Sequence, residues 1–337
     1  MATYSQAGVD LEAADQLVAA IGPAVTATWH GGIVGGFGGF AAGLTLPAGY
    51  RNPVLMMSTD GVGTKVDVAR RAGMLDGLGF DLVAMCVDDL AAAGARPIAM
   101  MDYIAVGHLD VAAVAAIVRS VAAACESVGV ALVGGETAEH PGVMEEDALD
   151  IAGTALGIVE LGAEIDGSRI VAGDVLVGID SPNFRSNGFS LLRSALAGLE
   201  LTSELPGTGR SVASVLLEPS VVYAPVVLDV IGAVDAHGLA HVTGGGIAGN
   251  LERVLPSSVD ASVDTASWQR PEAFDVVARL GGIDHSEMFR TFNMGIGFIA
   301  VVPAAEAATA IDVISAAGRR AWQIGEIREG TGRAVLG

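Results

Sequence analysis

Hydrophobic residues in the first half of the chain recur with periods that alternate between those of helices and those of strands. Helical spacing marks residues 11–22, where Asp10 is placed to cap the start of the helix and Gly22 to end it. It also marks residues 109–129, behind the capping residue Asp110. A third helix is predicted over 78–97, and strands over 52–60, 97–107, the start of 131–142, and 149–160.

The second half repeats this mixture after a polar, glycine-punctuated break at residues 162–174. Strands are predicted at 174–181, 294–303 and 320–327, with a strand running into a loop at 241–246, and helices at 186–199, 218–234, 249–255, 271–282 and 304–318. Alternating strands and helices indicate an α/β layered fold. We place the boundary between two domains at the break, giving domains 1–167 and 168–337.

Charge and composition exclude several classes of function. The formal net charge is −21, and phosphate-rich surfaces such as nucleic acids or anionic membranes require clustered Lys and Arg. Apolar stretches are interrupted well before the roughly 20 residues needed to cross a bilayer. Cys86 and Cys125 have neither metal-site nor disulfide spacing, so we expect them to be buried thiols in a reducing cytoplasm.

Lys65 is the only lysine among the 18 basic residues. Most surface lysines can be exchanged for arginine at little cost, so a lysine retained in such a chain is a functional candidate. It ends the stretch DGVGTK, which lacks P-loop spacing but contains the parts of a phosphate site. A carboxylate, backbone N–H groups and a hydroxyl come from Asp60, Gly61, Gly63 and Thr64. The alternative is a tight turn followed by a solvated lysine.

Acidic side chains in apolar surroundings suggest a magnesium site. Asp88 and Asp89 interrupt an apolar helix, where a buried carboxylate needs a cation or hydrogen-bond donors. Glu136 follows an apolar strand, the position at which α/β sheets place ligand residues. We predict Asp60, Asp89 and Glu136 as joint ligands of Mg²⁺, with helix capping and an acidic surface loop as the alternatives.

Two glycine-rich segments are candidate nucleotide-binding loops. The first is dense in glycine between residues 31 and 43, which indicates a flap or a loop that something approaches closely. Its G-x-G-x-x-A match to a dinucleotide fingerprint has no clear strand before it. The second precedes a predicted helix, next to His241. The glycines concerned are Gly35, Gly36, Gly38 and Gly39 in the first segment, and Gly244, Gly245 and Gly246 in the second.

Residues 185–187 add a possible anion site at a helix start. Arg185 offers a planar fork suited to a phosphate monoester. Ser186 and Asn187 are common N-cap residues in any protein, so capping is the alternative to ligand binding.

Taken in order, these segments resemble the phosphoribosylformylglycinamidine cyclo-ligases, also called aminoimidazole ribonucleotide synthetases. The resemblance rests on YSQAGVD, GGFGGF, STDGVGTK, DLVAMCVDDLAAAGARP, LVGGETAEHPG, SNGFSL, LLEPSVVY, HVTGGG, FRTFNMGIG and WQIGEI, which span nearly the whole chain. It implies a two-domain fold whose N-terminal strands form a barrel shared by a homodimer. It also implies ATP- and Mg²⁺-dependent ring closure of formylglycinamidine ribonucleotide.

The same resemblance implies roles for the candidate residues. Asp60, Asp89 and Glu136 would bind metal–ATP, Lys65 would neutralise phosphate or developing charge, and the loop Gly35–Gly39 would cover ATP. Residues of the second half would line the nucleotide or substrate site: Arg185, Ser186, Asn187, His241 and Gly244 to Gly246.

Some positions depart from the family pattern. Asp88 stands where asparagine is usual, Arg185 where histidine is frequent, and Ser5 where some members have lysine. Three other functions stay open: another ATP-dependent phosphoryl-transfer enzyme of the superfamily, a nicotinamide oxidoreductase, or a non-catalytic nucleotide-binding protein.

Overall fold

The computed structural model describes residues 11–337, which divide into two compact units. The first contains the chain up to Leu90 together with Arg96–Leu161, and the second contains Ala91–Ala95 and Gly162–Gly337. The motif YSQAGVD, with Ser5 and the predicted capping residue Asp10, lies outside the described residues.

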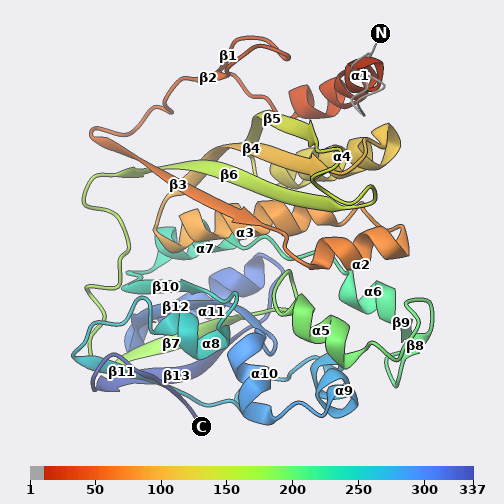
Figure 1. Cartoon of the computed structure of the whole chain (residues 1–337). Helices are drawn as coiled ribbons and strands as arrows, with labels where there is room; N and C mark the ends of the chain where they lie inside the picture. The colour runs from red at the N-terminus through yellow and green to blue at the C-terminus, as the bar shows by residue number, and fades with distance from the viewer. Residues whose placement is uncertain (1–10) are drawn as a thin grey trace. The chain divides into compact units, whose positions relative to one another are not determined.

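The first unit is built on a four-stranded mixed sheet (Figure 1). Its strands lie in the order β3 (Pro53–Gly61), β6 (Leu149–Glu160), β4 (Arg96–Val106) and β5 (Ala131–Glu139). β4 and β5 are parallel, whereas β6 is antiparallel to both of its neighbours. The four strands predicted in this half of the sequence are therefore confirmed.

Helices cover only one face of this sheet. They are α1 (Leu11–Ala27), α2 (Lys65–Ala72), α3 (Leu78–Ala92) and α4 (Val111–Ser127). The opposite face leaves apolar side chains in solvent, among them Met57, which is 69% exposed, and Met101, which is 47% exposed. Glycine-rich residues 31–43 contain the two-residue strand β1 (Ile33–Val34), which pairs with β2 (Gly43–Leu44) across a loop.

Helix α1 does not end at Gly22, so that prediction is wrong. It continues to Ala27 with Pro23 inside it. Val25 is buried in this last turn, and the Thr26 hydroxyl donates to the Gly22 carbonyl. Beyond the helix, Trp29 Nε1 donates to Leu132 O of edge strand β5 at 2.7 Å. Tertiary packing therefore outweighs the local stop signal.

Helix α4 begins as its sequence predicts. The Asp110 side chain accepts hydrogen bonds from the backbone N–H groups of Ala112 and Ala113. Both thiols, Cys86 and Cys125, are free and buried, which confirms their expected packing role. Across residues 11–337, no helix combines the length and hydrophobicity that a membrane crossing requires.

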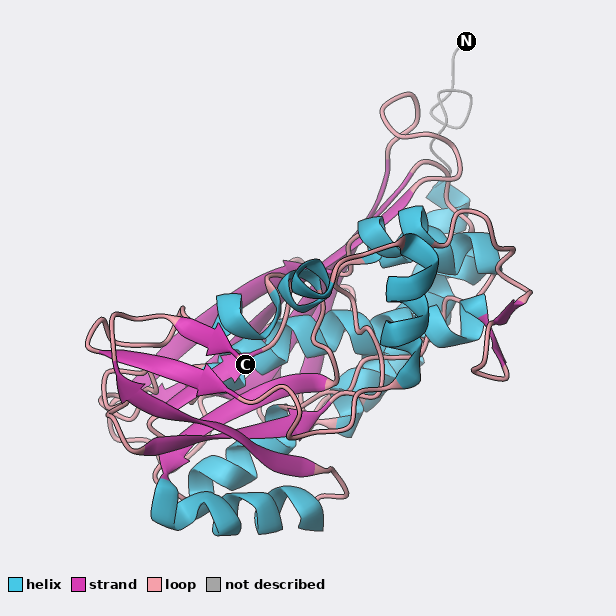
Figure 2. Cartoon of the chain, turned by 90° about the horizontal axis from the view of Figure 1, so that it is seen from below, coloured by secondary structure: helices cyan, strands magenta, loops and turns pink. Residues whose placement is uncertain are grey.

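The second unit contains a six-stranded sheet (Figure 2). Every residue of its strand β7 is buried, so both faces are covered at that position. In spatial order the strands are β10 (Gly238–His241), β12 (Ile296–Pro303), β7 (Asp174–Asp180), β13 (Ala321–Glu329), β11 (Val259–Val263) and β14 (Ala334–Leu336). A small hairpin joins β8 (Glu204–Leu205) to β9 (Arg210–Ser211).

The helices of the second unit differ in part from prediction. The helix expected over 218–234 is shorter, because it begins beyond Pro219 with Pro225 in its first turn. Strands β11 and β14 were not predicted, and β14 is only three residues long. The helices are α5 (Phe189–Ala195), α6 (Val212–Leu216), α7 (Ala224–Ala233), α8 (Gly246–Leu251), α9 (Glu272–Gly281), α10 (His285–Thr291) and α11 (Ala307–Ala316), with a 3-10 turn at Ala304–Glu306.

Candidate active site

The DGVGTK stretch forms the turn between β3 and α2. Asp60 is half-buried at the end of β3, and its Oδ1 accepts a hydrogen bond from the Gly61 N–H at 2.7 Å. Gly63 has φ +70°, a conformation that favours glycine. Gly63 and Thr64 are exposed, and Thr64 makes no side-chain cap bond. The turn therefore exposes Gly63 and Thr64 to solvent.

Lys65 is fully buried at the first position of α2. Its Nζ lies 2.8 Å from Asp81 Oδ2 and 2.9 Å from Asp81 Oδ1, and the side chain of Asp81 is likewise inaccessible to solvent. The structure thus pairs the single lysine with a carboxylate in the first turn of α3. A solvated lysine, the alternative drawn from sequence, does not occur.

Carboxylates gather around the Cys86 thiol on α3. Its Sγ lies 3.4 Å from Gly153 O and 3.9 Å from Asp60 O. Burial raises the pKa of the Cys86 thiol to about 12, and the nearby charges of Asp60, Asp89 and Asp88 raise it further. Asp88 is buried and Asp89 is half-buried. Asp60 and Asp89 therefore lie in one neighbourhood, as their predicted joint role requires.

Glu136 lies elsewhere on the sheet. Strand pairing places Asp60, Gly153, Asp102 and Gly135 in one row on one face. Glu136 is the next residue along β5, so it projects from the opposite face, two strands further from β3 than Gly153. Within residues 11–337 no three His, Cys, Asp or Glu side chains are arranged to hold a metal ion. One chain does not unite the three predicted ligands.

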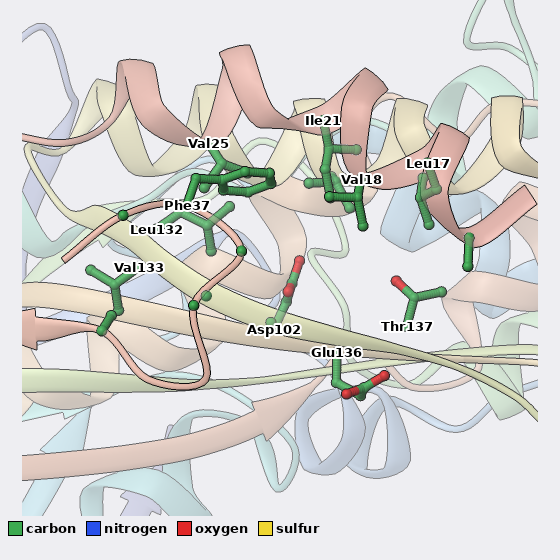
Figure 3. Close-up of a pocket in the computed structure, with 18 of the residues that line it drawn as sticks. Leu17, Val18, Ile21, Val25, Phe37, Asp102, Leu132, Val133, Glu136 and Thr137 are labelled. Atoms are coloured by element: carbon green, nitrogen blue, oxygen red, sulfur yellow. The ribbon is translucent and has the colours of Figure 1, made fainter. Parts of the chain in front are cut away.

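A cavity of about 330 Å³ opens beneath the first glycine-rich loop (Figure 3). Its walls come from α1, from the loop and from β5, and the Asp102 side chain points into it from β4. The predicted loop residues Gly36, Gly38 and Gly39 line it, but Gly35 does not. Burial raises the pKa of the Asp102 carboxyl to about 7. Sequence analysis missed Asp102, whose one signal is a carboxylate within an apolar strand.

In the second unit, Arg185 and His241 form a buried pair. Arg185 Nη1 lies 2.6 Å from His241 Nε2, and Arg185 Nη2 donates to Val221 O at 3.2 Å. The guanidinium also stacks 4.8 Å from the centre of the Tyr223 ring. Because the guanidinium only donates, His241 Nε2 accepts, and the imidazole proton of this pair lies on Nδ1.

The loops around this pair lie side by side. Arg185 has φ +57°, held by a hydrogen bond from its N–H to Asn183 Oδ1 at 2.9 Å. A Cβ placed on Gly244 would lie 3.6 Å from Asn187 Oδ1. Gly245 and Gly246 both have positive φ, and a Cβ on Gly246 would clash with Phe289 O at 1.9 Å. The structure therefore brings together the predicted residues of this unit.

Two family models cover most of the chain. The AIR synthase related protein N-terminal domain matches residues 44–159, and the corresponding C-terminal domain matches residues 171–336. A phosphoribosylformylglycinamidine cyclo-ligase of Myxococcus xanthus is 44% identical over 99% of this chain and 98% of its own length. This chain belongs to the phosphoribosylformylglycinamidine cyclo-ligase family. The family suggested by the ordered motifs is thereby confirmed.

Solved structures show that the fold extends beyond this family. The hydrogenase maturation protein HypE in complex with ATP matches with a TM-score of 0.70 at 20% identity, covering 96% of this chain and 90% of HypE. Thiamine-monophosphate kinase from Stenotrophomonas maltophilia matches with a TM-score of 0.69 at 20% identity, covering 96% and 94%. At such identities the likeness supports the fold alone.

At two positions where the sequence departs from the cyclo-ligase pattern, Arg185 and Asp88, the structure shows the surroundings of the side chain. Arg185, in place of the family's frequent histidine, donates to His241. Asp88, in place of asparagine, is buried on α3 next to the carboxylate neighbourhood around Cys86. Asp81, the partner of Lys65, opens the motif DLVAMCVDDLAAAGARP and lies in the first turn of α3, but it was not among the predicted site residues.

Proposed function

We propose that the protein catalyses the ATP-dependent cyclisation of formylglycinamidine ribonucleotide to 5-aminoimidazole ribonucleotide, with release of ADP and phosphate, in purine biosynthesis. The observation that carries this proposal is the 44% identity, over nearly the full length of both chains, to a cyclo-ligase. At that level the family motifs are retained in order from STDGVGTK to WQIGEI.

The reaction sets clear requirements on the site. The formyl oxygen is a poor leaving group until a phosphoryl group from ATP is attached to it. The amidine nitrogen then attacks the formyl carbon, the ring closes, and phosphate leaves. Catalysis of this kind depends mainly on positioning and on neutralising phosphate charge.

Residues of the first unit suit the phosphate end of ATP. Gly61, Gly63 and Thr64 present the exposed turn after β3, and Asp60 with Asp89 supplies carboxylates beside it. Magnesium commonly takes one or two carboxylates together with substrate phosphates and water, so this pair suffices in one chain. Glu136 borders the cavity under the glycine-rich loop through its place on β5, but its side chain projects from the opposite face of the sheet, so we assign it to the edge of the nucleotide-binding region and not to the metal ligands of one chain.

Residues of the second unit suit the ribonucleotide. Ser186 and Asn187, next to Gly244 to Gly246, provide hydroxyl, amide and backbone groups for a phosphate or ribose. Arg185 and His241 support this loop from below as a buried pair. We assign them a positioning role, with His241 fixed in one tautomer by its donor.

We also infer a homodimer that pairs the uncovered faces of two four-stranded sheets. The support is the apolar character of that face, where Leu55, Met57, Met101 and Tyr103 are exposed. Since both thiols are free and the sequence lacks long apolar runs, we place the enzyme in the cytoplasm.

The deciding experiment follows ADP release by the purified protein with ATP, Mg²⁺ and formylglycinamidine ribonucleotide while the aminoimidazole product is quantified. We expect one ADP per imidazole formed and little ADP release without the ribonucleotide. ADP release that depends on another acceptor, such as thiamine monophosphate, would assign the protein to a different phosphoryl-transfer activity. Tight ATP binding without any product would identify a non-catalytic nucleotide-binding protein.

A further inference from the structure

A second cavity, of about 560 Å³, lies wholly within the second unit between α8, α10 and β14. Helices α8 and α10 pack against each other there (Figure 1). Two sequence motifs meet at this cavity, because Gly245 belongs to HVTGGG, whereas Phe289 and Arg290 begin FRTFNMGIG. None of the residues assigned to ATP or to the ribonucleotide comes from the second motif. The volume of the cavity falls within the range for small-ligand sites.

The lining of the cavity combines small and apolar groups with charged side chains. Gly245, Ala248 and Gly249 line it from α8 and the residue before that helix. From α10 come Phe289, which is buried, and Arg290, whose side chain is 78% exposed. Such a lining suits a ligand that has a compact body and an anionic group.

Arg290 is the cation of this cavity. Its Nε lies 3.2 Å from Glu287 Oε2, one turn earlier on α10. This ion pair engages only the Nε edge, and neither Nη group donates a hydrogen bond within residues 11–337. A guanidinium presents parallel N–H groups that match two oxygens of a phosphate. Arg290 is therefore placed to bind a phosphate monoester.

Glu252, at the end of α8, brings a carboxylate to the same cavity. Its Oε1 accepts a hydrogen bond from the Ala334 N–H at 3.3 Å and lies 3.7 Å from Arg333 Nη1. These contacts orient the carboxylate and offset its charge, so a phosphate can approach Arg290. Carboxylates bind ribose hydroxyls in dinucleotide sites. A cation and a carboxylate in one cavity thus match the two ends of ribose 5-phosphate.

Gly249 provides an independent observation. It lies inside α8, where glycine is less stable than alanine. A Cβ added to Gly249 would meet no atom within 4 Å, and the residue does not have positive φ. Neither packing within the described residues nor backbone conformation therefore explains a glycine there. Close approach of a ligand to the helix does explain it.

We propose that this cavity binds the ribose 5-phosphate end of the ribonucleotide substrate, with Arg290 on the phosphate and Glu252 on the ribose hydroxyls, an inference that rests on the proposed function. Gly245 borders the cavity, and a Cβ on the preceding Gly244 would lie 3.6 Å from Asn187 Oδ1. The cavity and the residues already assigned to the ribonucleotide are therefore neighbours along one loop.

The test measures binding of D-ribose 5-phosphate and D-ribose by calorimetry without ATP, and KM for formylglycinamidine ribonucleotide. Wild-type protein should prefer the phosphorylated sugar by about tenfold or more, as expected for a hydrogen bond to a charged group. Arg290→Met should abolish this preference and raise KM for the ribonucleotide by about tenfold, with KM for ATP unchanged. Glu252→Gln should weaken binding of both sugars and keep the preference for phosphate.

Two control variants separate ligand contact from general charge and from the ion pair. Arg279→Met removes the same charge from an exposed position on α9 and should bind as wild type does. Glu287→Gln removes the ion pair but keeps Arg290, so it should bind ribose 5-phosphate at least as tightly as wild type. Gly249→Ala should raise the midpoint of thermal unfolding yet weaken ribose 5-phosphate binding, a combination that a purely structural glycine would not give.

A folded Arg290→Met protein with wild-type affinity for ribose 5-phosphate would overturn the proposal, as would an equal loss in Arg279→Met. AMP carries the same ribose 5-phosphate group and tests the source of the ligand. Arg290-dependent binding of AMP that does not compete with formylglycinamidine ribonucleotide would overturn the assignment to the substrate. Product assays separate the two proposals. Arg290-dependent binding of ribose 5-phosphate without imidazole formation by wild type would reject the cyclo-ligase activity alone, whereas imidazole formation with an unchanged KM in Arg290→Met would reject this inference alone.

Discussion

Lys65 Nζ and Asp81 Oδ2 lie 2.8 Å apart, and neither side chain is accessible to solvent. The pair joins the first turn of α2 to the first turn of α3, directly after the exposed residues Gly63 and Thr64. Removing one member of a buried ion pair leaves the other charged in a poorly solvated place. Lys65 therefore contributes to the stability of the site as well as to its charge.

We expect Lys65→Met to lower the free energy of unfolding by about 3–5 kcal/mol, because the Asp81 carboxylate loses the ammonium group that is buried against it. Chemical denaturation measures this loss. Arg71→Met is the control on the same helix, since its ion pair with Asp67 is exposed and at 4.0 Å should contribute less than about 1 kcal/mol. A Lys65→Met protein with wild-type stability and no turnover would instead give Lys65 a purely chemical role.

Asp102 predicts an unusual pH dependence of stability. Burial raises its pKa to about 7 in the folded protein from 3.8. Between these values the folded state keeps a proton that the unfolded chain releases, so this group lowers stability as pH rises from about 4 to 7. Asp102→Asn should therefore stabilise the nucleotide-free protein at pH 8, by up to about 4 kcal/mol, and change little at pH 4. Equal effects at both pH values would contradict the shift.

If the exposed face of the four-stranded sheet forms the dimer interface, a charge introduced at Met57 should weaken the dimer. Met57→Asp should convert a dimer into a monomer, because two carboxylates would be buried at the interface. Sedimentation equilibrium measures the change in mass. Val143→Asp introduces the same charge at a loop position that is 83% exposed, and it should leave the dimer intact. A dimer that survives Met57→Asp places the interface on another surface.

Substitution of Ser186 should affect substrate binding without affecting the stability of the fold. Its hydroxyl is buried and makes no hydrogen bond within residues 11–337. Ser186→Ala should therefore leave the midpoint of thermal unfolding unchanged or slightly raised. If the hydroxyl binds the ribonucleotide, KM should rise by about fivefold or more with a smaller change in kcat. An unchanged KM would remove Ser186 from the substrate site.

Most of the fold could be predicted from sequence, since period and capping are local properties. Asp110 caps α4 as its position indicates, and the strands of both sheet centres lie where apolar runs occur. The end of α1 could not be predicted, because long-range packing of Val25 carries the helix past Gly22. The edge strand β14 is too short to show a period.

The site was predictable as a set of motifs but not as geometry. The motif sequence identified the turn at Asp60 and the loops at Arg185 and Gly244. It could not reveal that Lys65 is buried against Asp81, or that Glu136 projects from the opposite face of the sheet from Asp60, because both depend on strand register. Asp102 could not be predicted as a site residue, because it is buried only by α1 and the glycine-rich loop, which are far from it in the sequence.

Because the single lysine is buried, its chemical modification can be used to detect local opening of the structure around α2 and α3. Acylating reagents must reach the amine they attack, and the one side-chain amine of this chain lies 2.8 Å from Asp81 Oδ2 and is enclosed in the native state. Modification of Lys65 therefore requires α2 and α3 to separate. The rate of Lys65 acylation, followed by mass spectrometry, therefore measures how often α2 and α3 open locally.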